Sequence, residues 1–274
     1  MLERHRPSAP LDVAVDCIWF SRRDESSPER EHMLPTGNVN LIITLHDSPI
    51  EWAHGNGSTP SGSWTRGVVH GPQRRYYLVG PKPKGAVVGV SFRPGMAAAL
   101  LGVSMNELRD SHPSLDELWG YRGLELHERL ASAADARGAL RMLEDELLAR
   151  IRRPLLLHPA VAHALRRSSS GTQRIDEIEQ QTGYSPRHFI HLFRSTVGLA
   201  PKQYFRIRRF SNALARLAAG DAKLAEVALS AGYADQAHLT REFRELAGVT
   251  PSLYRPRSPD SAHHHVVGKE SSRR

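Results

Sequence analysis

Two stretches near the end of the chain combine paired apolar residues with polar side chains at helical spacing. Phe189 and Phe193 are four residues apart in the first stretch, and Leu239 and Phe243 repeat that pair in the second. The opposite faces carry hydrogen-bond donors and acceptors, which are the groups that read base edges in a DNA major groove. These face residues are Arg187, Ile190, His191 and Arg194, and then Gln236, His238, Thr240 and Arg241.

A single polar face of this kind is usually just a solvated helix surface, but here the stretch belongs to an internal repeat. Residues Ile175–Tyr204 align with Leu224–Tyr254. Aligned residues are 49 positions apart up to and including a Gly-Tyr turn, and 50 positions apart beyond it, because the second copy contains one inserted residue. Each copy is typical of a helix-turn-helix. In the first copy, a short helix is expected over Ile175–Gln181, a turn at Gly183 and a second helix after Ser185. The repeat therefore favours two recognition helices.

The segment between the copies, Lys202–Ala219, is predicted to be one uninterrupted helix with an apolar stripe through Phe210 and Leu214. A rigid connector fixes the distance between the two second helices. If that distance is about 34 Å, both can enter successive major grooves on one face of the duplex. Phosphate contacts are predicted for Arg194, Lys202, Arg206, Arg209, Thr240, Arg244 and Arg255.

Positive charge is concentrated in the same part of the chain, whose 274 residues have a formal net charge of +8. Residues 156–257 hold 15 Lys and Arg against 8 Asp and Glu, whereas residues 1–155 hold 19 of each. A basic domain beside a neutral one is typical of a polyanion-binding module joined to a domain with another task. We therefore expect double-stranded DNA as the partner of residues 156–257.

Residues 1–155 are predicted to form a β-rich domain followed by helices. Short apolar runs bounded by turn residues indicate strands over Val13–Val15, Val39–Leu45, Gly67–Val69, Tyr76–Val79 and Ala86–Val90. Helices are expected over Met96–Leu101 and Leu124–Ile151. The second helix carries an apolar stripe that is either core or a homodimer interface, formed by Leu140, Leu143, Leu147 and Ile151. Residues 258–274 are expected to be a disordered tail, and the chain as a whole to be α+β.

The repeat resembles the DNA-binding domain of AraC/XylS-type transcription regulators over residues 158–257. The resemblance lies in the two Gly-Tyr turns and in two blocks that run from Phe193-Arg194 to Tyr204 and from Phe243-Arg244 to Arg255. It implies a bipartite helix-turn-helix domain joined by a linker helix. It also implies base contacts from Arg187, Ile190, His191, Gln236, Ala237, His238 and Arg241. Ile190 and Ala237 depart from the polar residues often found there, so methyl contacts to thymine are expected at those points.

The N-terminal part resembles the sensor domain of one AraC-type subgroup, through Leu34–Ile43 and Gly89–Val103. The resemblance implies a cupin-like β-barrel or sandwich followed by helices, without giving a ligand. A pocket lined by aromatic residues with one or two arginines would suit a planar or anionic effector. For each residue taken alone, packing in the protein core is the alternative explanation of its presence. The candidates are Trp52, Trp64, Arg66, Tyr76, Phe92 and Arg93.

Enzyme chemistry has little support in the sequence. His32, His46, His54 and His70 lie in the β region, but none forms a His-x-His pair with a following carboxylate, so no metal or cofactor is expected. The only cysteine, Cys17, excludes an intramolecular disulfide and a cysteine zinc site, which leaves a structural thiol or a redox sensor. Neither a Gly-x-Ser-x-Gly elbow nor a phosphate-binding Gly-Lys-Ser/Thr loop occurs.

These observations predict a one-component transcription regulator rather than an enzyme. Its N-terminal domain would sense a small molecule or mediate a homodimer, and its C-terminal domain would bind DNA and act with RNA polymerase. A cytoplasmic location without membrane contact is expected, because no apolar run approaches the roughly 18 residues of a spanning helix and no secretion signal is evident. The alternative is a metal-dependent cupin-type enzyme that carries a DNA-binding domain.

Overall fold

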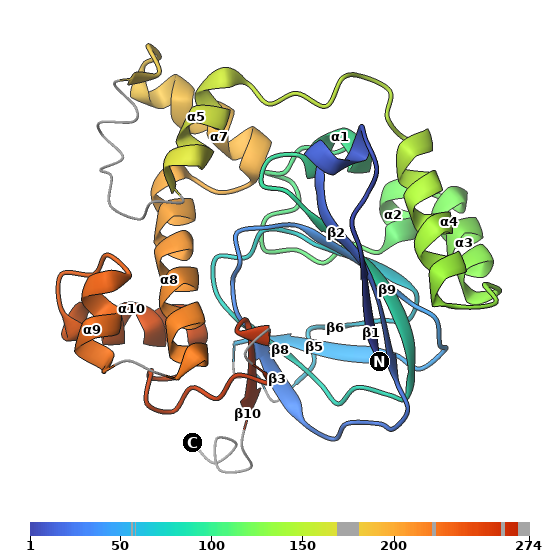
Figure 1. The fold of residues 1–274 in the computed structure, drawn as a ribbon, viewed down its shortest axis with the longest axis horizontal. Coiled ribbons are helices and arrows are strands. Elements are labelled where there is room, and N and C mark those ends of the chain that lie inside the picture. Colours follow the sequence, from blue (N-terminus) through green and yellow to red (C-terminus); the bar gives the residue numbers. More distant parts are fainter. Residues whose placement is uncertain (56, 58, 169–180, 221–222, 259–260, 268–274) are drawn as a thin grey trace.

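The computed structural model shows a β-rich N-terminal part and a helical C-terminal part that lie side by side (Figure 1). It describes residues 1–55, 57, 59–168, 181–220, 223–258 and 261–267. The α+β class predicted from the sequence is confirmed. Across these described ranges, none of the helices combines the length and the apolar character needed to span a membrane.

The strands of the described chain form two antiparallel sheets of five strands each. The first sheet has the order β1-β2-β9-β4-β7, with bounds Leu2–His5, Val15–Arg23, Gly85–Phe92, Asn40–Thr44 and Gly67–His70. The second has the order β10-β3-β8-β5-β6, with bounds His264–Val267, Arg30–Met33, Tyr77–Val79, Ile50–His54 and Gly62–Trp64. This pair of sheets agrees with the predicted barrel or sandwich.

The central strand β9 shows why the first sheet forms. Ala86, Val88, Val90 and Phe92 alternate along it, and all four are buried in one hydrophobic core. The helices on that face are α1 (Ala97–Leu101), α2 (Leu115–Trp119), α3 (Tyr121–Ala131) and α4 (Ala136–Ala149). A smaller apolar cluster, which includes Ile42 from the first sheet and Tyr77 from the second, joins the two sheets.

Three predictions for this part need correction. Leu11–Val13 is a 3-10 helix, and the strand begins only at Val15. The long helix expected over Leu124–Ile151 is broken after Ala131, because Asp135 starts a new helix by accepting a hydrogen bond from the Gly138 N–H. The stripe on that second helix is buried in the core at Leu140, Leu143 and Leu147, so it is not a homodimer surface.

The C-terminal part consists of α5 (Pro159–Ser168), α7 (Pro186–Val197), α8 (Pro201–Ala219), α9 (Leu224–Ser230) and α10 (Gln236–Ala247). The predicted connector helix is confirmed as α8. The helix expected over Ile175–Gln181 lies outside the described residues except for Gln181. Apolar residues of α5 and α7 form one core with the start of α8, and those of α9 and α10 form a second core with its end.

The chain after Ser258 departs from the predicted disorder at His264–Val267, which forms strand β10. This strand pairs antiparallel with β3 and extends the second sheet, so residues 264–267 return to the N-terminal part. Glu31 of β3 anchors it, because this fully buried carboxylate accepts hydrogen bonds from Lys82 and Arg257 and contacts His264 Nδ1 at 3.0 Å. Burial opposes ionisation of Glu31, but interactions with His264 and Lys82 outweigh it and hold its pKa well below the usual range.

Candidate DNA-binding interface

The first candidate recognition helix, α7, is capped and oriented by its own sequence. The Ser185 side chain accepts a hydrogen bond from the His188 N–H at 3.4 Å, and a proline opens the helix. Phe189 and Phe193 are buried beneath it, whereas Ile190 is partly buried at the edge. The polar side chains exposed on the opposite side include Arg187, His191 and Arg194.

The second candidate recognition helix, α10, repeats this construction. Asp235 accepts a hydrogen bond from the His238 N–H at 2.6 Å, and Leu239 and Phe243 form the buried side. The His238 ring is partly buried against the Tyr233 ring, with centroids 5.2 Å apart. The side chains exposed on the outer face include those of Gln236, Ala237, Arg241 and Arg244.

Helix α8 sets the separation of the two recognition helices, which lie near its opposite ends (Figure 1). It has 19 residues, and at about 1.5 Å per residue its axis is roughly 28 Å long. Adjacent major grooves on one face of B-DNA are about 34 Å apart. The connector is therefore of the right order of length for two helices that enter successive grooves.

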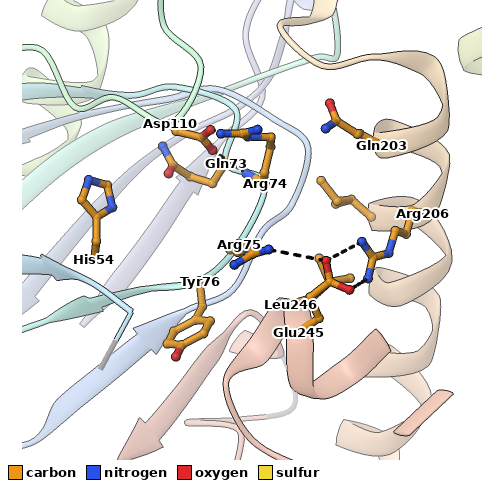
Figure 2. Close-up of a pocket in the computed structure, with 11 residues that line it drawn as sticks. His54, Gln73, Arg74, Arg75, Tyr76, Asp110, Gln203, Arg206, Glu245 and Leu246 are labelled. Carbon is orange, nitrogen blue, oxygen red and sulfur yellow. Dashed lines mark hydrogen bonds and ion pairs between the residues drawn. The ribbon is translucent and has the colours of Figure 1, made fainter. Parts of the chain in front are cut away.

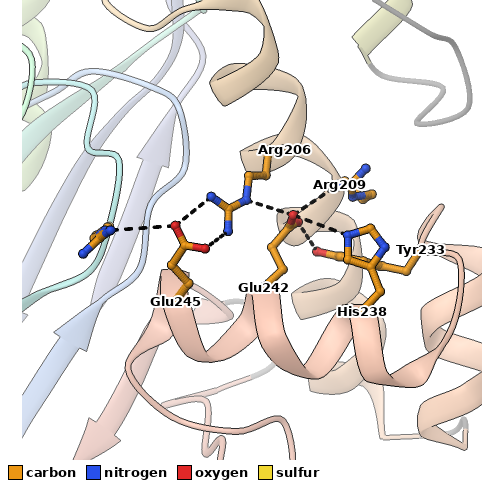
Figure 3. Close-up of polar contacts among 7 residues, drawn as sticks. Arg206, Arg209, Tyr233, His238, Glu242 and Glu245 are labelled. Carbon is orange, nitrogen blue, oxygen red and sulfur yellow. Dashed lines mark hydrogen bonds and ion pairs between the residues drawn. The ribbon is translucent and has the colours of Figure 1, made fainter.

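A buried carboxylate fastens α10 to α8 (Figure 3). Glu242 is only 6% exposed, and its Oε2 accepts hydrogen bonds from Arg206 Nε and Arg209 Nη2, each at 2.8 Å. Its Oε1 accepts a hydrogen bond from the Tyr233 hydroxyl at 2.9 Å. Glu245, one turn further along α10, binds the other side of the Arg206 guanidinium. These two carboxylates raise the pKa of Arg206 above its ordinary value against the effect of burial.

This network corrects the prediction that Arg206 and Arg209 contact DNA phosphates. Both guanidinium groups are engaged by carboxylates inside the domain, and Arg209 also lies 4.7 Å above the Tyr233 ring. The repeat concealed this role because the first copy has Leu192 where the second has Glu242. The positive charge of these two arginines is thus offset within the protein.

The remaining predicted phosphate contacts stay on the surface. The Thr240 hydroxyl donates a hydrogen bond to the Gln236 carbonyl at 2.8 Å, and the Arg255 guanidinium donates to the Ser252 and Tyr254 carbonyls. The four cationic side chains of this group are exposed at the ends or outer faces of α7, α8 and α10 or just beyond them, and these are Arg194, Lys202, Arg244 and Arg255. Among the described residues, no carboxylate forms an ion pair with any of these four.

The β-rich part holds the C-terminal end of each recognition helix by backbone hydrogen bonds. In α7, the Ser195 carbonyl accepts from the Met105 N–H at 3.2 Å. In α10, the Leu246 carbonyl accepts from the Tyr76 N–H at 3.0 Å, and the next carbonyl lies 2.9 Å from His32 Nδ1. The final carbonyls of a helix lack partners within the helix. The N-terminal part supplies them at both recognition helices.

Close backbone approach at two glycines reinforces this junction. Gly198 and Gly248 end α7 and α10 with φ of 86° and 75°, and they occupy equivalent positions in the repeat. A Cβ at Gly198 would lie 2.3 Å from a Pro72 side-chain atom, and one at Gly248 would lie 2.3 Å from the Tyr76 ring. Only glycine fits these contacts. The same position of each repeat thus touches the β-rich part.

A cavity of about 490 Å³ lies at this junction (Figure 2). Its walls come from both parts of the chain, including Tyr76 and Arg75 on one side and Arg206 on the other. Glu245 lies between the two arginines, and Arg75 reaches it only at 3.8 Å with a side chain that is 71% exposed. Arg75 is therefore a cation that a small anionic molecule could engage.

Of the six predicted effector-pocket residues, only Trp52 and Trp64 contact each other, with ring centroids 6.1 Å apart. Phe92 is fully buried in the core of the first sheet, Arg93 lies at the surface near Asp16, and Arg66 is exposed. Trp64 is buried in the cluster between the sheets. Of the six, only Tyr76 lines the junction cavity, and Trp52 lines a smaller hollow of about 280 Å³. The predicted pocket is wrong because the strands turn these side chains toward different layers.

The four histidines considered as metal ligands are also separated. His32 contacts the end of α10 and His46 packs against Gly85. His54 lines the junction cavity, and His70 is buried between the sheets. Within the described residues, no group of three or more His, Cys, Asp or Glu side chains is arranged to hold a metal ion. His70 does meet a histidine that the sequence did not single out, His112, which comes from a distant loop.

Comparison with known proteins supports the assignment of the helical part. Residues 178–257 match a family described as a helix-turn-helix domain, and residues 3–114 match a domain of unknown function. The HTH-type transcriptional activator AarP of Providencia stuartii is 32% identical over 81 residues, which are 30% of this chain and 60% of that protein. The probable transcription factor PqrA of Proteus vulgaris is 33% identical over 82 residues, which are 30% of this chain and 67% of that protein.

The solved structure of ToxT from Vibrio cholerae covers 92% of this chain and 96% of its own, with 10% identity and a TM-score of 0.47. The helix-turn-helix region is what identifies the family. The chain belongs to the AraC/XylS-type family of helix-turn-helix transcription regulators.

Proposed function

We propose that this chain is a one-component transcription regulator that binds double-stranded DNA through α7 and α10 in successive major grooves. The observation that carries the proposal is the pair of capped helices at the two ends of α8, each with an exposed face of polar side chains. Base contacts are assigned to Arg187, Ile190, His191, Gln236, Ala237, His238 and Arg241. Phosphate contacts are assigned to Arg194, Lys202, Arg244 and Arg255, with Thr240 at the rim.

The junction offers a route by which the N-terminal part could regulate DNA binding. It holds the final turns of both recognition helices, so a displacement there changes their relative position. The cavity of about 490 Å³ adjoins the Tyr76 and Leu246 backbone contact. We place a small-molecule effector in this cavity, with an anionic group bound by Arg75. Such a ligand regulates only if it binds the two arrangements of the junction with different affinity.

The regulator is expected to act in the cytoplasm and to influence RNA polymerase at the promoters it binds. No catalytic role is included in the proposal. The metal-dependent enzyme considered from the sequence would need an accessible metal centre beside a substrate cavity. The junction cavity and the hollow at Trp52 are both lined without His70 or His112.

The division between base and phosphate contacts is testable with the full-length chain and a duplex enriched by it from a random pool. Arg241→Ala is expected to relax preference at one base position and to cost about 1–3 kcal/mol there. Arg244→Ala is expected to weaken binding to all sequences alike and to lower the salt-dependence slope by about one. Arg141→Ala, at an exposed arginine of α4 in the N-terminal part, is the matched control and should change neither.

Fluorescence anisotropy titrations over a salt series measure both quantities. Equal losses for Arg241→Ala and Arg244→Ala on every duplex, with the same salt slope, would contradict the assignment. A loss of similar size for Arg141→Ala would show that the effect comes from net charge alone.

A further inference from the structure

Two imidazoles and a phenol converge between the two sheets, away from the candidate DNA-binding faces. His70 Nδ1 lies 2.9 Å from His112 Nδ1 and 3.0 Å from the Tyr77 hydroxyl oxygen. His70 ends β7 in the first sheet, and Tyr77 begins β8 in the second. His112 comes from residues 111–114, whose backbone pairs with the outer edge of β7. Three remote segments therefore bring polar atoms to a meeting point around His70 Nδ1.

The surroundings of this triad are aromatic. The Trp52 and Trp64 rings stack with centroids 6.1 Å apart, and they approach His112 and His70 at 4.4 and 4.7 Å. No described carboxylate forms a hydrogen bond or an ion pair with the triad. His70 and Tyr77 are almost fully buried, at 6% and 5% exposure. Whatever occupies the meeting point is thus shielded from solvent on most sides.

Hydrogen bonding alone does not satisfy the three atoms. If His70 Nδ1 is unprotonated, two cases remain. Either a proton on His112 Nδ1 competes with the Tyr77 O–H for one lone pair, or the lone pairs of the two Nδ1 atoms face each other. If His70 Nδ1 carries the proton, it donates to one neighbour, and the Tyr77 proton has no acceptor in the triad. His112 Nε2, on the other side of that ring, is buried without a partner among the described residues. Each tautomer leaves a buried polar group unpaired, which is costly.

We propose that His70 Nδ1, His112 Nδ1 and the Tyr77 oxygen form a binding site for a divalent first-row transition metal, of which zinc is the first candidate. A cation at the meeting point accepts a lone pair from each imidazole nitrogen, so the two rings no longer compete for a proton. The Tyr77 oxygen binds it as phenolate and releases its proton to solvent, against the burial that raises the pKa of this hydroxyl. Two imidazoles suit zinc, copper or nickel, whereas the absence of carboxylates from this triad disfavours magnesium and calcium. The three ligands leave a fourth position open.

The place of the site in the fold supports the same inference. Tyr77 directly follows Tyr76, whose N–H holds the end of α10. A metal ion would therefore join the two sheets one residue away from the contact that positions a recognition helix.

The test uses full-length, tag-free protein that is stripped with a chelator and never exposed to a metal-affinity resin. Zinc is titrated against a chromophoric chelator, and cobalt is titrated while visible absorption is recorded. One equivalent of zinc per chain and a cobalt absorption band of tetrahedral intensity are expected. His70→Gln and His112→Gln should each weaken zinc binding by more than about 100-fold, since loss of even an outer-shell partner costs 10–100-fold.

Two controls keep the result interpretable. His54→Gln removes an exposed histidine whose ring lies 4.9 Å from Trp52 but outside the triad, and it should leave the affinity unchanged. Tyr77→Phe keeps the ring packing, so the circular dichroism of the chain should not change. The variant should nevertheless bind zinc more weakly and show a shifted cobalt absorption spectrum. Zinc binding that survives His70→Gln and His112→Gln but falls with His264→Gln would place the metal in the C-terminal segment and overturn the proposal. Absence of stoichiometric binding would overturn it as well.

Discussion

Glu242→Gln is expected to destabilise the C-terminal part far more than Glu245→Gln, although the two residues lie one turn apart on α10 and share Arg206 as a partner. Glu242 is 6% exposed and receives hydrogen bonds from Arg206, Arg209 and Tyr233. The amide that replaces it offers one acceptor oxygen in place of two and brings a donor that faces other donors. Two largely enclosed guanidinium groups then lose their common counter-charge.

The magnitude follows from burial. Removing one partner of a buried ion pair costs about 3–5 kcal/mol, because the remaining charge is left uncompensated. The two arginine side chains are 31% and 26% exposed, so water relieves part of this cost and a loss on the order of 3 kcal/mol is expected. Glu245 is 44% exposed, and its pair belongs to the class worth about 1 kcal/mol or less.

Urea unfolding followed by far-ultraviolet circular dichroism measures both variants in the full-length chain, with hydrogen exchange to locate the affected segment. The Glu242→Gln transition should move to clearly lower urea, with faster exchange in α10 and in the facing turns of α8. Equal midpoints for the two variants would refute the argument that burial makes Glu242 the anchor of α10. A large loss of stability for Glu245→Gln alone would also refute it, because the exposed carboxylate would then be the anchor.

Three further outcomes are expected. Burial lowers the pKa of His70 to about 3 and that of His112 to about 2, so the unfolded chain binds protons at both residues that the folded chain does not as pH falls below about 6.5. Each of these histidines should therefore cost the metal-free protein about 2 kcal/mol of stability between pH 7 and 5, and His70→Gln should reduce the slope of the urea-midpoint profile by the contribution of one histidine. Ending the chain at Arg257 removes β10 and should increase hydrogen exchange along β3, whereas unchanged exchange would show that the strand contributes nothing. Gly248→Ala should loosen the junction at Tyr76. Gly220 has a similar φ of 84° but no described atom within 4 Å of a new Cβ, so Gly220→Ala should show strain without that loosening in the same exchange experiment.

The sequence predicted the helical part well because its signals are local. Capping residues such as Ser185 and Asp235, and apolar pairs such as Phe189 and Phe193, act within one or two helical turns. The internal repeat then placed the two recognition helices and the connector relative to each other. Only the role of arginines within α8 was missed, because their partner Glu242 lies more than 30 residues away.

The N-terminal part was predicted only in outline, because its arrangement depends on pairings between distant strands. β3, β5 and β6 are short and not strongly apolar, so their sequences alone give little signal. The predicted effector residues were chosen by type, yet Phe92 and Tyr76 turned out to lie in different layers. The meeting of His70 with His112 and the return of β10 to β3 depend on contacts across 42 and about 230 residues, which no local pattern encodes.

In-vitro selection of random duplex DNA with the full-length chain tests the central claim most directly. Two short enriched blocks about one helical turn apart are expected, one for each recognition helix. Arg187→Ala should blur one block and Arg241→Ala the other. Enrichment of a single block, or of none with binding that disappears as salt rises, would contradict the two-helix account and leave only a basic surface.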